Sequence, residues 1–330
     1  MPEAPSLRPR AGVDYPRDRI EFTTFFPDDA ACAAYLERLR WGDGFQCPNG
    51  HRADEAWRSE RGLRVCPTCR CQVSVTAGTI FEGTRKLRQW FLAAWDVTSQ
   101  KYGASALGLK RTLGLGSYET AWAWLHKLRR AMVRPDRDQL AGEIEVDETY
   151  VGGTEPGLGG RRTVKKAIVI VLVEMNEGKI GRIRLRQVPD VSAASLQGVI
   201  AAVVKPGSLV HTDGWQGYAK LARRGFRHRV TVDRTSSEPA HVLFPGVHRV
   251  ASLLKRWCLG THQGAIRRTH LDYYLDEFTF RFNRRNSKAR GLLFFRLMTQ
   301  AVRTEPVRTD ELFSVGTRQR RTGSNRHHNQ

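Results

Sequence analysis

The sequence has no hydrophobic run long enough to cross a membrane. Its longest apolar stretch, residues 167–173, is far shorter than the roughly 20 residues that a membrane helix needs. Residues 1–20 contain four prolines and no apolar run, which argues against a signal peptide and predicts a flexible arm. The chain also lacks internal repeats. We therefore expect a soluble protein of the cytoplasm.

Acidic residues are scarce relative to basic ones. The 330 residues include 33 Asp and Glu against 54 Lys and Arg, which gives a formal net charge of +21. The positive charge is spread through segments with folded character instead of one tail or one amphipathic helix, so a nucleic acid is the expected partner. With 40% hydrophobic residues, the chain is large enough for two or three folded units.

Cysteine is almost absent beyond residue 71, since five of the six cysteines lie before residue 72. This clustering argues against a disulfide framework spread over the chain and favours a metal site in a reducing compartment. Cys32 and Cys258 have apolar, helix-like surroundings, so we expect both of them in the hydrophobic core.

Four residues in this cluster have the spacing of two zinc knuckles. Cys47 and His51 are followed after fourteen residues by Cys66 and Cys69, which gives a C-x3-H-x14-C-x2-C pattern. Zinc takes four such ligands in a tetrahedron, and knuckles on facing hairpins provide that geometry. The second knuckle is the stronger signal, and Cys71 is a reserve thiolate. The alternative is a set of ordinary buried thiols beside a surface histidine.

Changes in composition divide the chain after the flexible arm of residues 1–20. Residues 21–82 hold the cysteines and short strand-like runs, which predicts a small β zinc ribbon. Residues 84–134 have apolar residues at helical spacing, which predicts a helical, helix-turn-helix-like DNA-binding domain. Residues 139–303 alternate strand-like and helix-like runs, so we expect a mixed α/β catalytic domain. The polar, basic residues 304–330 predict a disordered tail.

The helical segment is expected to contain three helices, over residues 87–100, 105–113 and 117–133. A glycine-containing connection between the last two is what a helix-turn-helix requires. The third helix carries Lys127, Arg129 and Arg130 near its end, where cations suit both the helix dipole and phosphate contacts. Trp122 and Trp124 are expected to serve packing. A plain helical spacer is the alternative interpretation.

The α/β segment has the element order of an RNase-H-like fold with a mixed five-stranded sheet. The periodicity predicts three strands, a helix, a strand, a short helix, a strand and then helices. The expected strands lie at 143–151, 165–174, 181–188, up to 211, and 227–232. The expected helices lie at 192–204, 216–224, 247–258, 270–283 and 291–303.

Two aspartates in this segment are candidate metal ligands. Asp147 lies in a strand-like run, where an ionised residue is costly to bury without a partner or a metal. Strand alternation places it on one face with Glu145 and Thr149. Asp213 ends an apolar strand before a glycine turn. Two such carboxylates at adjacent strands can hold divalent ions about 3.5–4 Å apart, although each alone is also a common turn cap.

Four segments of this α/β region resemble the DDE transposases of the insertion-sequence family numbered fifteen-ninety-five. They are Val146-Asp-Glu-Thr-Tyr-Val-Gly-Gly153, Thr212-Asp-Gly-Trp-Gln-Gly-Tyr218, Ser252-Leu-Leu-Lys-Arg256 with Gly260-Thr-His-Gln-Gly264, and the stretch from His270 to Arg285 that ends in Arg-Phe-Asn-Arg-Arg. The resemblance covers roughly residues 20–303, because that family also has an N-terminal zinc ribbon. It implies that Asp147 and Asp213 are the first two metal-binding aspartates.

The third acidic position of that family falls on His248 in this chain. The family has it seven residues before a lysine, here Lys255, and thirty-four residues separate Asp213 from His248. An imidazole replaces the usual glutamate or asparagine, and it ligates a metal when neutral but supplies no negative charge. Either the site works as Asp-Asp-His with Lys255 nearby, or this copy is impaired. Glu238 is the best substitute carboxylate, and a helix-capping surface role for His248 is the remaining alternative.

The resemblance implies a bacterial transposase that depends on Mg²⁺, with Mn²⁺ as a possible substitute. Such an enzyme binds the terminal inverted repeats of its element as a homo-oligomer on double-stranded DNA at the nucleoid. Water attacks a phosphodiester at the element end, and the released 3′-OH then attacks target DNA. The alternatives are a zinc-ribbon DNA-binding regulator derived from a transposase, and an RNase-H-like nuclease or resolvase without strand transfer.

Overall fold

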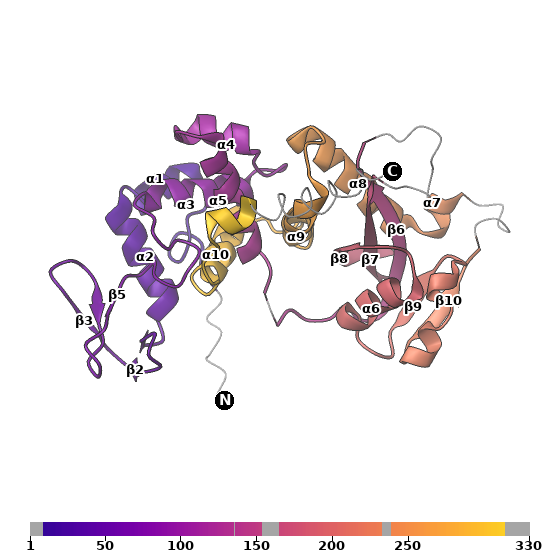
Figure 1. The fold of residues 1–330 in the computed structure, drawn as a ribbon, viewed down its shortest axis with the longest axis horizontal. Helices are drawn as coiled ribbons and strands as arrows, with labels where there is room; N and C mark the ends of the chain where they lie inside the picture. The colour runs from indigo at the N-terminus through magenta and orange to yellow at the C-terminus, as the bar shows by residue number, and fades with distance from the viewer. Residues whose placement is uncertain (1–8, 135, 154–164, 233–238, 314–330) are drawn as a thin grey trace, which may run out of the picture. The chain divides into compact units, whose positions relative to one another are not determined.

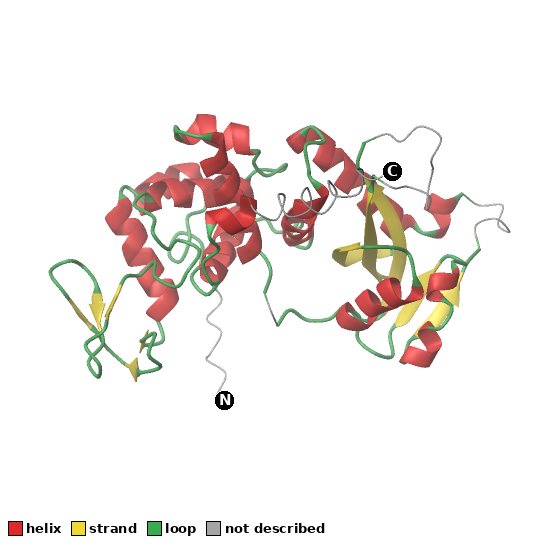
Figure 2. Cartoon of the chain, viewed as in Figure 1, coloured by secondary structure: helices red, strands yellow, loops and turns green. Residues whose placement is uncertain are grey.

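The computed structural model describes residues 9–134, 136–153, 165–232 and 239–313 (Figure 1). The chain divides into two compact units. Unit 1 combines Met1–Arg134 with Ser287–Gln330, and unit 2 comprises Pro135–Asn286. Helices dominate the described part of unit 1, whereas a sheet lies at the centre of unit 2 (Figure 2). No helix among the described residues is long and apolar enough to span a membrane.

The ribbon predicted for residues 21–82 is found from residue 45 onward, as two small antiparallel sheets of unit 1. Most of residues 21–41 form instead the helices α1 (Arg19–Phe25) and α2 (Asp29–Trp41), each of which begins at a capping aspartate. The first sheet pairs β1 (Phe45–Gln46) with β2 (Arg52–Ala53), and the second has the order β3 (Trp57–Arg58), β4 (Arg64–Val65), β5 (Gln72–Val73). Strands of two residues bury little apolar surface. Among the described residues, the small core cluster of the ribbon comprises Phe45, Cys47, Ala56, Cys66 and Val73, with Trp41, Cys71 and Ala77 packed against it.

Three helices follow the ribbon close to the predicted positions. They are α3 (Leu87–Ser99), α4 (Ala106–Leu113) and α5 (Tyr118–Ala131). The hydroxyl of Ser105 caps α4 and that of Ser117 caps α5. Gly114 ends α4 at a φ of +61°, the left-handed conformation that glycine adopts without strain. The short connection between α4 and α5 therefore has the glycine and the capping serine that are typical of the turn in a helix-turn-helix.

The last described helix, α10 (Arg290–Ala301), lies in unit 1 although we expected it in the catalytic domain. It packs against α3, α5 and α2. Its Phe294 ring lies 5.7 Å from that of Phe22, 5.8 Å from that of Phe91 and 5.7 Å from that of Trp95. This aromatic cluster buries α10 with the N-terminal helices, and the amphipathic pattern of α10 alone did not reveal which unit it would join.

Residues 9–20 of the expected flexible arm and residues 304–313 of the expected disordered tail belong to the packed, described part of unit 1. From residue 9 the arm is packed: Tyr15 is buried, and the Asp18 carboxylate caps α1 by accepting from two backbone N–H groups. After α10, Val307 and Leu312 are buried, and the Phe313 ring stacks on Trp122 at 4.9 Å. A few apolar residues thus fix both segments. Residues 1–8 and 314–330 lie outside the described residues.

Unit 2 contains the mixed five-stranded sheet of the predicted RNase-H-like fold. Its strands are β6 (Glu143–Val151), β7 (Ala167–Asn176), β8 (Lys179–Val188), β9 (Leu209–Thr212) and β10 (Arg227–Val230). Their order is β10-β9-β6-β7-β8. The pairs β6–β7 and β7–β8 are antiparallel, whereas β6–β9 and β9–β10 are parallel. The expected fold class is therefore confirmed.

Helices cover both faces of this sheet. The helix α6 (Ala193–Val203) with the short turns η2 (Gln216–Tyr218) and η3 (Leu221–Arg224) packs on one face. The helices α8 (Pro245–His262) and α9 (Leu271–Phe282) pack on the other, and α7 (Ala240–Leu243) precedes α8. Alternate side chains of β7 enter the two cores. The longest apolar run of the sequence is thus a strand buried on both faces.

The outer edge of β8 is closed by side chains from the end of α9. The Asn283 side chain accepts from the N–H of Ile183 at 2.7 Å and donates to its carbonyl at 3.1 Å. Arg285 donates to the carbonyl oxygens of Gly181 and Ile180. These contacts satisfy backbone groups that an edge strand leaves open to other chains. They give a structural role to the Phe-Asn-Arg-Arg segment of the sequence.

A buried carboxylate from β6 caps the first turn of α8. Phe244, the N-cap residue, supplies no side-chain hydrogen bond, and the Glu145 carboxylate accepts from the N–H of Val247 at 3.0 Å and also from that of Gly246. Burial raises the pKa of Glu145, while these bonds lower it. A Cβ at Gly246 would lie 2.7 Å from the Glu145 carboxylate and 2.7 Å from the sulfur of Met175. The glycine therefore lets α8 approach the sheet closely.

We expect Glu145→Ala to lower the free energy of unfolding by about 1–3 kcal/mol, because two buried N–H groups lose their acceptor. Glu143→Ala is the matched control on the same strand and face. The Glu143 side chain is 40% exposed and pairs with Arg229, so its loss should cost less than about 1 kcal/mol. Urea denaturation measures both values, and equal losses for the two variants would contradict the capping role of Glu145.

Candidate functional site

The four predicted zinc ligands converge in the ribbon. One ligand atom from each of Cys47, His51, Cys66 and Cys69 lies within 4.8 Å of all the others. The sulfur atoms of Cys47 and Cys69 are 3.5 Å apart. Tetrahedral zinc with bonds of about 2.3 Å to sulfur separates its ligand atoms by about 3.8 Å. The cluster therefore has the size and the donor types of a structural zinc site.

The backbone of both knuckles supports thiolates. The N–H of Asn49 donates to the Cys47 sulfur at 3.4 Å, and its side-chain amide donates to the Cys69 sulfur at 3.5 Å. A bond from the N–H of Cys71 lowers the pKa of Cys69 to about 7, and a bond from the N–H of Cys69 lowers the pKa of Cys66. Burial instead raises the pKa of Cys47 to about 11.

The imidazole of His51 fits the same site. Its Nδ1 atom is buried and has no hydrogen-bond partner among the described residues, which leaves a lone pair for a metal. Cys71, the reserve thiolate, is not a member of the four-residue group. Cys32 and Cys258 are buried in the helical cores as expected, and burial raises the pKa of each to about 12.

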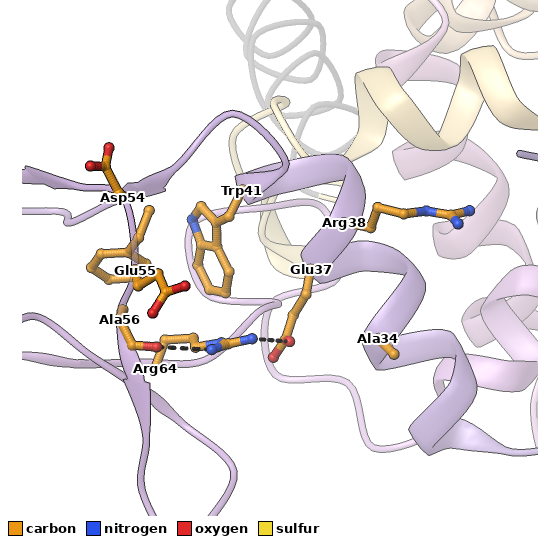
Figure 3. A pocket seen from close by; sticks show the side chains of 9 residues that line it. Ala34, Glu37, Arg38, Trp41, Asp54, Glu55, Ala56 and Arg64 are labelled. Atoms are coloured by element: carbon orange, nitrogen blue, oxygen red, sulfur yellow. Dashed lines mark hydrogen bonds and ion pairs between the residues drawn. The ribbon is translucent and has the colours of Figure 1, made fainter.

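An ion pair holds the ribbon against α2. Arg64 donates to the Ala56 carbonyl at 2.9 Å and to the Glu37 carboxylate at 2.8 Å (Figure 3). Arg58 reaches the same carboxylate at 2.6 Å. A pocket of about 520 Å³ with mixed charge lies beside these residues, and Trp41 lines it. The pocket belongs to unit 1, so it is separate from the carboxylates predicted to be catalytic.

The parallel pairing of β6 with β9 stops two residues before Asp147 and Asp213. The β6–β9 pairing runs from Glu143↔Leu209 to Glu145↔His211. Asp147 lies two residues further on β6, and Asp213 directly follows the end of β9. Strand alternation puts Asp147 on the face of Glu145, which binds the first turn of α8, so Asp147 lies on the side of the sheet where α8 begins. His211, two residues before Asp213, has its ring 4.5 Å from that of Phe244.

Backbone hydrogen bonds orient both carboxylates. The N–H of Glu148 donates to Asp147 Oδ1 at 2.7 Å, and the N–H of Trp215 donates to Asp213 Oδ1 at 3.0 Å. The Trp215 indole in turn donates to the carbonyl of Val191 at 2.9 Å. The segment that carries Asp213 is thus anchored to the start of α6.

Tyr218 and His211, two buried residues of the same region, have shifted pKa values. Burial raises the pKa of Tyr218 well above 10, and the negative charges of Glu148, Asp147 and Asp213 raise it further. The buried phenol of Tyr218 therefore lies close enough to both aspartates for their charges to affect its pKa. Burial and Arg229 lower the pKa of His211 to about 4. Its ring is neutral near pH 7 and adds no positive charge beside Asp213.

His248 and Lys255 both belong to α8. His248 is half-buried in the first turn, directly after Val247, which the Glu145 carboxylate holds. Lys255 is exposed and lies seven residues further along the helix, which is about 10 Å. His248 therefore lies near Glu145, the residue two positions before Asp147 on β6. Lys255 lies two helical turns further along α8. Glu238, the substitute carboxylate, lies outside the described residues.

The sequence patterns assign no role to Glu145, Gly246 or Tyr218. Strand alternation puts Glu145 on the face of Asp147 but identifies no partner for it. An acidic residue two positions before a candidate ligand, inside an apolar strand, was the available signal. Gly246 follows Pro245 at the start of a helix. The need for glycine there becomes visible only when the sheet surface that it packs against is known.

The expected phosphate contact of Arg129 in α5 is wrong. Arg129 is 1% exposed, because α5 packs against α3, α4 and α10. Of the other two cations, Arg130 is exposed and Lys127 is half-buried. Trp122 and Trp124 serve packing as predicted: Trp122 stacks on His126 at 3.8 Å, and Trp124 stacks on Trp90 at 4.3 Å.

Solved structures with some likeness to this chain include an integrase core and a transposase complex. The "catalytic core domain of BIV integrase" aligns with a TM-score of 0.28 and 16% identity, over 42% of this chain and 81% of that chain. The "Mos1 Strand Transfer Complex" aligns with a TM-score of 0.27 and 14% identity, over 64% of this chain and 75% of that chain. No curated protein matches the sequence.

Two domain families match the sequence in the order that the fold requires. Residues 27–72 match the transposase zinc-ribbon domain, and residues 139–283 match the ISXO2-like transposase domain. The first match covers the four converging ligands, and the second covers Asp147, Asp213, His248 and Lys255. Together they span more than half of the chain. The chain therefore belongs to the insertion-sequence transposases that join an N-terminal transposase zinc ribbon to an ISXO2-like transposase domain.

Proposed function

We propose that this transposase binds the ends of its own mobile element and cleaves and joins DNA at Asp147, Asp213 and His248. The proposal is supported by the β6–β9 register, which ends two residues before each aspartate, and by the contact of Glu145 with the first turn of α8. A regulator that only binds DNA does not need this pair. Strand transfer, in contrast, requires carboxylates fixed beside a third ligand.

Asp147, Asp213 and His248 would hold Mg²⁺, or Mn²⁺ in its place. The donor set fits such an ion, because backbone N–H groups already fix one oxygen of each carboxylate. When bound, the metal polarises phosphoryl oxygens and lowers the pKa of a bound water. A neutral imidazole at the third position leaves two ligand charges, and nitrogen is a ligand that Mn²⁺ accepts more readily than Mg²⁺ does.

The protein contributes position and charge to two successive phosphoryl transfers. In the first, an oxygen of water bonds to phosphorus at the element end and the 3′-oxygen leaves as a hydroxyl. In the second, that 3′-OH attacks a target phosphodiester, so that one P–O bond forms and one breaks in each step. Glu145 and Gly246 set the place of His248 over the sheet, and Lys255 contacts a DNA phosphate from the same helix.

DNA binding is assigned to unit 1 and to the positive charge of the whole chain. The net charge of +21 favours a polyanion, and the ribbon with α4 and α5 provides the end-binding elements. Cutting two ends of one element requires more than one active site, so we propose a homo-oligomer on double-stranded DNA, located at the nucleoid. Zinc held by Cys47, His51, Cys66 and Cys69 stabilises the ribbon, whose core is too small to fold alone.

Metal analysis of the purified protein should find about one zinc per chain. The double variant Cys66→Ser with Cys69→Ser is expected to lose that zinc, because two of the four ligands are removed. Cys71→Ser is the matched control, since Cys71 is a neighbouring thiol outside the four-residue group, and it should keep the metal. Full zinc content in the double variant would overturn the ligand assignment.

Strand transfer should depend on both aspartates. Protein, Mg²⁺, an oligonucleotide that carries the element end, and a supercoiled plasmid should give a joined product. We expect Asp147→Asn, Asp213→Asn and His248→Ala each to lower its yield by at least about 100-fold while end binding persists. Asp272→Asn, an exposed carboxylate of the same unit, is the control and should leave the yield unchanged.

Other outcomes of this assay separate the remaining functions. Cleavage without any joined product would identify a nuclease or resolvase, and end binding without either reaction would identify a regulator. Normal transfer by His248→Ala together with loss in Glu238→Ala would move the third ligand to Glu238.

A further inference from the structure

Arg70 adopts a backbone conformation that favours glycine. Its φ is +60°, in the left-handed region that side chains with a Cβ rarely occupy. The second knuckle imposes this turn, because the N–H of Arg70 donates to the carbonyl of Cys66 at 3.0 Å. An arginine therefore stands where a glycine would fit with less strain. Such a cost is typical of a residue whose side chain has a function.

The side chain of Arg70 lies over an exposed tryptophan. Its guanidinium carbon is 4.5 Å from the centre of the Trp57 ring, and Trp57 is 45% exposed. Trp57 pairs with Val65 on β4, the strand that leads directly into the second knuckle. The sheet thus places the indole beside the knuckle turn. A guanidinium resting on a ring loses less side-chain entropy when it then binds a partner.

Arg70 differs from the neighbouring arginines of the ribbon in its side-chain partner. Arg58 and Arg64 of the same sheet both pair with the Glu37 carboxylate. For Arg70, the described residues offer the Trp57 ring and no carboxylate as a side-chain partner. In a chain with a net charge of +21, a preoriented guanidinium on an exposed ring fits a polyanion better than an acidic small molecule.

We propose that Trp57 and Arg70 form a direct contact between the ribbon and duplex DNA. The guanidinium fork donates two N–H groups to paired acceptors, which are either O6 and N7 of a guanine or two phosphate oxygens. The exposed indole packs beside it on the sugar–phosphate backbone. This inference rests on the DNA binding proposed above and names the side chains through which the ribbon makes it.

Arg70→Gly separates this role from folding. Glycine accepts the φ of +60° without strain, so the zinc-loaded, full-length variant should keep about one zinc and a melting temperature no lower than that of the wild type. Its affinity for an end-containing duplex, measured by fluorescence anisotropy, should fall about 10-fold. Trp57→Ala should also weaken binding. Arg61→Ala removes the same charge from another exposed site of the ribbon and should change the affinity by less than about 3-fold.

A second duplex of equal length and unrelated sequence distinguishes the two acceptors. If Arg70 reads guanine, Arg70→Gly weakens end binding more than unrelated binding, and if it binds phosphate, both weaken equally. Unchanged affinity of Arg70→Gly and Trp57→Ala for both duplexes would overturn the inference. Failure of the wild-type protein to bind either duplex would instead contradict the proposed function itself.

Discussion

The parallel pairing of β6 with β9 is the constraint on which the candidate active site depends. Its register places Asp147 and Asp213 two residues beyond the last paired residues, so a shift by one residue would turn one of them to the opposite face. The same strand provides Glu145, whose buried carboxylate caps α8 and thereby places His248. The loop after Asp213 is tied to α6 through Trp215. Three segments far apart in the sequence are thus fixed around one short stretch of sheet before any substrate is bound.

The ribbon depends on a different constraint, because its strands are too short to stabilise it. Its described core cluster is small, and two of the buried residues in it are the cysteines Cys47 and Cys66. We propose that zinc binding supplies what a larger apolar core would otherwise provide. The ribbon is also attached to α2 by Glu37, which accepts from both Arg58 and Arg64. Trp57 and Arg70 do not take part in this attachment, and the Arg70 guanidinium lies over the Trp57 ring.

Local patterns predicted most of the elements and the donor residues. The knuckle spacing identified four ligands that converge, and the alternation of β6 put Asp147 on the face of Glu145. Tertiary packing decided what sequence could not. Phe294 carries α10 into unit 1, Tyr15 and Val307 order segments that composition marked as loose, and Arg129 is buried by its neighbours. The cap that Glu145 provides depends on an N–H group 102 residues away in the sequence. Periodicity within a strand or helix cannot predict a contact between residues so far apart.

Divalent-metal binding to unit 2 tests the central claim most directly, because it needs neither the element end nor turnover. Mn²⁺ titrated into the zinc-loaded protein and followed by electron paramagnetic resonance reports the free ion. The account predicts saturable binding by the wild type and its loss in the double variant Asp147→Asn with Asp213→Asn, with zinc content unchanged. Equal Mn²⁺ binding by the wild type and this double variant would contradict a metal site built on the β6–β9 register.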